Sequence, residues 1–137
     1  MVTTTYIKNE KQIVALVVRQ TKKIRKKVDF ITHDKNEMQI AIMNRPAKNI
    51  VKAHFHPQQK RITKKTSEFL YVVEGHMKVS FYKSKKKLKK ITTKELKTGD
   101  FLCFINCGHS IEFLKKTSLI EVKQGPFTKN KDKIFLT

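Results

Sequence analysis

The chain has 137 residues, a length that fits a single domain able to bury a hydrophobic core without disulfide bonds. It carries 31 basic and 11 acidic residues, a formal net charge of +20, and its two cysteines are Cys103 and Cys107. No apolar run is long enough to span a membrane, and the first residues lack the basic region of a secretion signal. We therefore expect a cytoplasmic protein with free thiols and no membrane partner.

The positive charge comes almost entirely from lysine, since only four of the 31 basic residues are arginines. Specific nucleic-acid recognition relies on bidentate arginine, and the lysines are spread along the whole chain. Lysine-biased composition is therefore the favoured explanation, and nucleic-acid binding is the alternative. In either case the charge would attract a small anionic ligand.

Strands are predicted along the whole chain, because apolar residues alternate or form short β-branched runs between turn residues, and no segment has a helical period. The run Ile13–Val18 is continuous, so we expect it to be buried on both faces or within a dimer. Lysine-rich turns are expected at 22–27 and 83–87. The predicted strands, in chain order, are 6–9, 12–19, 28–32, 37–43, 50–57, 68–74, 77–82, 88–96, 101–105, 110–114, 118–123 and 133–136.

This pattern predicts an all-β fold with turns every eight to twelve residues or so, which is typical of a small antiparallel barrel or sandwich. We expect one domain over residues 1–137, in which the amino-terminal strands 6–45 pack on the barrel or extend it.

Four residues along these strands and turns have metal-binding side chains. His54 and His56 are two residues apart, so a strand would present both imidazoles on one face. Glu68 begins a later alternating segment, and His109 follows a turn after another apolar run. Three histidines and one carboxylate suit a divalent transition metal such as iron, manganese, nickel, zinc or copper.

The same residues resemble the two sequence motifs of the cupin superfamily, over roughly residues 49–125. The first motif is matched by His54, His56, Glu68 and Gly75, and the second by Gly99, Asp100 and His109. The resemblance implies a cupin-like jelly-roll barrel in which His54, His56, Glu68 and His109 bind one divalent metal. The tail 120–127 is similar to that of small cupins encoded among surface-polysaccharide (O-antigen or capsule) biosynthesis genes.

A basic segment separates the histidine pair from Glu68. It contains Lys60, Arg61, Lys64 and Lys65, which we expect to line the mouth of the barrel and contact an anionic ligand. The alternative is an exposed loop with no role in binding.

These observations predict a metal-binding protein that binds or acts on a small polar, anionic or sugar-like ligand, with a homodimer as the expected assembly. Whether it is an enzyme stays open, because a fold does not select a reaction and no catalytic residue is evident. Glu74 is placed at a strand end and Asp100 in a turn, so a second carboxylate base is not seen. The alternatives are a metal-dependent oxygenase or isomerase, and a nucleic-acid-binding or oligomeric scaffold on a cupin that has lost its metal.

Overall fold

The computed structural model describes residues 3–19, 27–83, 88–129 and 132–137. The predicted turn at 22–27 and the one at 83–87 fall almost entirely outside these residues. Within them the chain forms strands and no α-helix. The strands are β1 (Thr3–Asn9), β2 (Gln12–Arg19), β3 (Val28–Phe30), β4 (Ala41–Met43), β5 (Glu68–Glu74), β6 (His76–Tyr82), β7 (Lys90–Lys97), β8 (Phe101–Phe104), β9 (Gly108–Phe113) and β10 (Ser118–Lys123).

A search of the described residues for a helix long and apolar enough to cross a membrane finds none.

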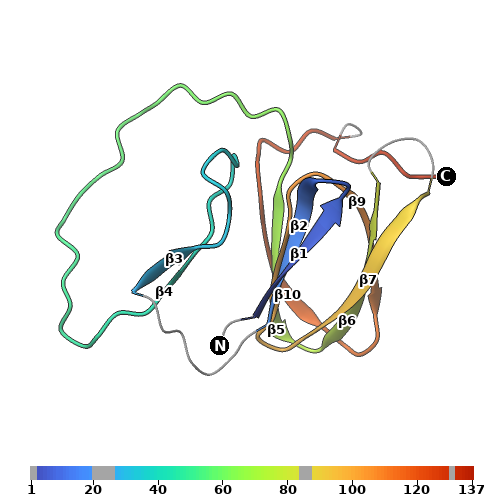
Figure 1. The fold of residues 1–137 in the computed structure, drawn as a ribbon, viewed down its shortest axis with the longest axis horizontal. Helices are drawn as coiled ribbons and strands as arrows, with labels where there is room; N and C mark the ends of the chain where they lie inside the picture. The colour runs from blue at the N-terminus through green and yellow to red at the C-terminus, as the bar shows by residue number, and fades with distance from the viewer. Residues whose placement is uncertain (1–2, 20–26, 84–87, 130–131) are drawn as a thin grey trace.

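The strands form three antiparallel sheets, with the orders β1-β2-β8-β5-β10, β7-β6-β9 and β3-β4. Figure 1 shows the first two sheets facing each other, with the β3–β4 hairpin beside the five-stranded sheet. The prediction of an all-β antiparallel fold is confirmed. The sheets remain separate in the described residues and do not close into one barrel.

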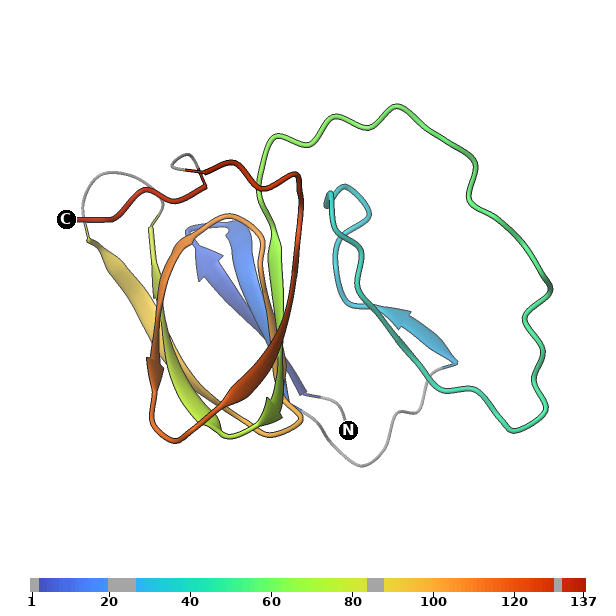
Figure 2. The same cartoon turned by 180° about the vertical axis from the view of Figure 1, so that it is seen from behind.

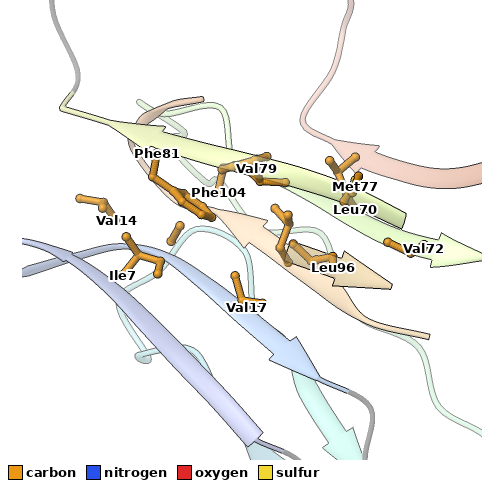
Figure 3. Packing of buried hydrophobic residues seen from close by; sticks show 12 residues of the cluster. Ile7, Val14, Val17, Leu70, Val72, Met77, Val79, Phe81, Leu96 and Phe104 are labelled. Carbon is orange, nitrogen blue, oxygen red and sulfur yellow. The ribbon is translucent and has the colours of Figure 1, made fainter. Parts of the chain in front are cut away.

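The main core fills the space between the two large sheets, as Figure 3 shows. It forms because alternate residues of each strand point inward, which brings apolar side chains of both sheets together. Its buried members are Ile7, Val14, Ala15, Val17, Leu70, Val72, Met77, Val79, Phe81, Leu96, Leu102 and Phe104.

A second apolar layer lies on the outer face of the five-stranded sheet. Leu16 and Val18 of β2 point to this face, and residues of the 31–42 segment cover them. The segment contributes Ile31, Met38, Ile40 and Ile42. Of the run Ile13–Val18, residues 14–18 are buried within one chain and Ile13 is exposed. Burial on both faces, the first of the two expected alternatives, is therefore confirmed for residues 14–18.

Residues 44–66, called the arc below, differ from the sequence prediction. A strand was predicted at 50–57, but the arc contains no strand and all of its residues are exposed. The reason is that a strand needs a hydrogen-bonded neighbour, and the arc extends away from both large sheets (Figures 1 and 2). Its carboxyl end is held by Glu37, whose carboxylate oxygens each accept a backbone N–H, one from Lys64 and one from Lys65, at 3.2 Å.

Two other strand predictions are also corrected. Residues 133–136 form no strand, and only Ala41–Met43 of the predicted strand 37–43 is paired. The first part of that segment instead makes side-chain packing contacts on the outer face of the sheet, so its alternating pattern reflects burial without strand pairing.

Candidate functional site

Two of the four predicted metal ligands meet at one end of the sandwich. Glu68 is the first residue of β5 in the five-stranded sheet, and His109 lies in β9 of the three-stranded sheet. Their side chains point into the space between the sheets, where the Nε2 atom of His109 lies 3.5 Å from the Oε2 atom of Glu68. Both are largely buried, with 29% and 19% of their side-chain surfaces exposed.

The imidazole of His109 is fixed by an aromatic contact. It stacks on the ring of Phe104 with 3.8 Å between the ring centroids and 10° between the planes. Burial is the largest influence on the pKa of His109 and lowers it, and the positive charge of Lys133 lowers it further. The backbone of Cys107 and, to a smaller extent, the charge of Glu121 oppose this shift. The ring is therefore neutral at neutral pH, which is the form that binds metals. Its buried Nδ1 atom has no hydrogen-bond partner among the described residues.

Two charged residues that were not predicted from the sequence lie beside Glu68 and His109. We call this end of the sandwich the mouth. β10 runs antiparallel to β5 and pairs Lys123 with Glu68, so Lys123 and Glu121 share the inner face with Glu68. Glu121 lies within hydrogen-bonding reach of the Glu68 carboxyl group. The Nζ atom of Lys123 lies 3.5 Å from the Oε1 atom of Glu121 and 3.8 Å from the Oδ2 atom of Asp132. The sequence contains a signal for this arrangement, because apolar and charged residues alternate over 120–123. Glu121 and Lys123 therefore share one face of the strand, and Ile120 and Val122 share the other.

Burial raises the pKa of Glu68, and the neighbouring Glu121 raises it further. Lys123 opposes this effect, but desolvation is the larger cause. The carboxylate is thus held where its charged form is disfavoured, as is common for groups that exchange protons or bind cations.

The other two predicted ligands lie elsewhere. His54 and His56 are exposed residues of the arc, with their ring centroids 5.3 Å apart. The Nδ1 atom of His54 lies 2.8 Å from the backbone carbonyl of Lys52, a contact within the arc. One chain therefore does not bring the four ligands together, and its described part holds no group of three His, Cys, Asp or Glu residues that could bind a metal.

The predicted ligand-binding cations also lie in the arc. Lys60, Arg61, Lys64 and Lys65 are exposed residues of the arc. Their side-chain role in ligand binding stays a prediction.

The cysteines do not supply a thiolate to this region. Cys103 is buried in the apolar layer and Cys107 is half-buried, and no disulfide joins them. Burial raises the pKa of each thiol to about 12, so both stay protonated at neutral pH.

A surface cavity of about 410 Å³ lies at the opposite end of β5. Gly75, Lys97 and Lys116 are among its lining residues, and none of the four predicted ligands is. The candidate ligands Glu68 and His109 therefore lie at the mouth and not in this cavity. The cavity is an open depression between turns, lined in part by lysines.

Comparisons with models of known protein families, with curated proteins and with solved structures find no match for this chain. The resemblance to cupins therefore depends on the motif residues of the sequence alone.

We expect the substitution Glu68→Gln to stabilise the metal-free protein at pH 7. A raised carboxyl pKa means that folding favours the protonated form, so its stabilising contribution is present below the unfolded pKa of about 4.5 and is lost as pH rises through the folded value. Thermal melts with chelator should show a higher Tm for the variant at pH 7 and little difference near pH 4. The control Glu10→Gln, at a side chain 82% exposed, should change Tm little at either pH. A lower Tm for Glu68→Gln at pH 7 would show that nearby cations stabilise the carboxylate.

Proposed function

We propose that this chain is a cupin-like protein that binds a divalent transition metal together with a small polar or anionic ligand at the mouth of its β-sandwich. The observation that carries the proposal is the contact of Glu68 with His109. A carboxylate and a neutral imidazole, presented from facing sheets and half-shielded from water, are two ligands of the type that iron, manganese, nickel and zinc accept.

The fit of a metal to one chain is incomplete. Two protein ligands leave the coordination shell of a stable transition-metal site half empty, and His54 and His56 are in the arc. What the chain's own residues supply is a site that excludes part of the solvent, orients one imidazole by stacking and holds a carboxylate beside it.

The charges around the mouth support an anionic group on the ligand. Lys123 lies on the inner face, and the positive charge of Lys133 also acts on both Glu68 and His109. With a net charge of +20 on the chain, a small anion would be drawn to the protein from a distance. A sugar-derived acid or phosphate fits this chemistry, and the link to polysaccharide biosynthesis remains part of the proposal.

A second candidate function is an isomerase, and one observation favours it. Glu121 lies beside Glu68, so the mouth contains the second carboxyl group that the sequence did not reveal. Two carboxyl groups and an imidazole in one site can take a proton from one position of a bound ligand and return it to another. The test is whether Glu121→Gln abolishes exchange of ligand protons with deuterated water while leaving ligand binding intact.

We expect protein purified without chelator to contain about one divalent metal ion per chain, and the His54→Ala/His109→Ala double variant to contain almost none. Elemental analysis of untagged protein, before and after reconstitution, measures both. His33→Ala is the matched control, because the His33 side chain is exposed in a separate turn, where its Nδ1 atom accepts a hydrogen bond from the backbone N–H of Lys35. Absence of metal from the reconstituted wild-type chain, or equal metal in the double variant, would refute the proposed site and turn attention to polyanion binding.

A further inference from the structure

The four predicted ligands form two pairs in this fold. One pair, Glu68 and His109, lies inside the sandwich, and the other, His54 and His56, lies on the exposed arc. We infer that the site is assembled between two copies of the chain, with the histidine pair of one copy completing the Glu68–His109 pair of the other. This inference rests on the proposed metal site and says where its remaining ligands come from.

Within the described residues, the sheet that carries His109 has an edge strand with a neighbour on one side. Among the described strands, β9 pairs only with β6, and β10 pairs only with β5. Large apolar side chains are exposed along these edges, including Phe113 at 56%, and Ile120 and Val122 at 52% each. An edge with unpaired backbone groups and apolar side chains is a template for another strand.

The arc contains a segment with the composition of a strand that could pair with the edge of β9. Ile50 and Phe55 are each 83% exposed and Val51 is 62% exposed, and residues 50–57 have the sequence pattern of a strand. A segment added to the edge of β9 would place alternate side chains on the inner face. His54 and His56 can therefore both face His109 from that position.

The arc of the same chain is held away from this edge. Glu37 fixes the backbone of Lys64 and Lys65, and the 31–42 segment packs on the outer face of β2 and β8. Figures 1 and 2 agree that the arc projects on the side of the hairpin, whereas β6, β7 and β9 form the opposite wall of the sandwich. An arc that projects outward with exposed apolar side chains is placed to reach a second molecule, and reciprocal exchange by two copies closes a symmetric dimer.

Complementation between two defective chains tests the inference. The first variant is His54→Ala/His56→Ala, and the second is Glu68→Gln/His109→Ala. Each is refolded alone and then together with the other in equal amounts, at a salt concentration that screens the positive charge. Zn²⁺ is the probe, and bound zinc is counted by elemental analysis after dialysis. Circular dichroism and thermal melts verify folding, and Glu68→Gln alone replaces the second variant if that variant does not fold.

The separate variants are expected to bind almost no zinc, and the mixture about one quarter of the wild-type amount. Random pairing makes half of the dimers mixed, and each mixed dimer has one complete site. A mixture with a chain carrying all four substitutions is the control and should bind none. Zinc binding by the wild type with no rescue in the mixture, or by a wild type that is monomeric in light scattering, overturns the inference but leaves the metal site standing. A wild type that binds no zinc overturns the proposed metal site and this inference with it.

Discussion

Replacing Phe81 by alanine is expected to lower the free energy of unfolding by about 3–5 kcal/mol. Phe81 is fully buried in β6, beside Phe104 in Figure 3, and its ring centroid lies 5.7 Å from that of Phe104. Phe104 in turn stacks on His109. The cavity left by the ring therefore removes packing from the sandwich and from the support of the candidate site.

Urea denaturation followed by circular dichroism measures this loss, with the midpoint and the slope fitted separately. The matched control is Phe135→Ala, at a phenylalanine that is 87% exposed, and it should cost less than about 0.5 kcal/mol. A loss below about 1 kcal/mol for Phe81→Ala would mean that the two sheets do not pack tightly in solution.

Zinc affinity of the Phe81→Ala protein separates the two roles of this contact. If Phe104 holds the imidazole of His109 in place, affinity should fall even in the part of the population that stays folded. An affinity equal to that of the wild type would show that β9 alone fixes His109.

Strands with strong local patterns could be predicted from the sequence. The run in β2 was recognised as buried on both faces because it is continuous and β-branched, and the structure covers both of its faces. Glu68 was predicted to begin an alternating segment, and it lies on the inner face with Leu70 and Val72. Period-two alternation determines which face a side chain occupies, so these predictions needed only local information.

Pairing between distant segments could not be predicted in the same way. The segment 50–57 has a strand pattern, but whether it forms a strand depends on a partner edge. In one chain no such edge is next to it, and the histidine pair remains exposed. The alternating pattern predicts that His54 and His56 share one face of a strand. It does not predict which sheet that strand would join.

Glu121 was missed for a related reason. Glu74 and Asp100 lie near the motif residues in the chain, whereas Glu121 reaches Glu68 only because β10 pairs with β5. The pairing of β10 with β5 is a property of the topology. Once the sheet order is known, the inward-facing side chains of the strands beside β5 can be assigned to the surroundings of Glu68.

Replacing Gly75 by alanine is expected to destabilise the protein by about 2–4 kcal/mol. Gly75 joins β5 to β6 with a φ of 119°, a conformation that residues with a side chain rarely adopt. An added Cβ would lie 2.5 Å from the backbone oxygen of Lys116 and 2.5 Å from the Oγ1 atom of Thr117. Backbone atoms cannot move aside cheaply, so the turn itself must change.

The contrasting substitution is Gly108→Ala. Its Cβ would also meet an atom at 2.5 Å, but this atom is the end of the flexible Leu136 side chain. We expect a loss below about 1 kcal/mol, measured by the same denaturation series. Equal losses at the two glycines would mean that close contact alone decides the cost. A larger loss at Gly75 would show that the glycine of the cupin-like motif is required by backbone conformation at the turn, at the end of β5 far from Glu68. That part of the motif would then concern folding and not the candidate site.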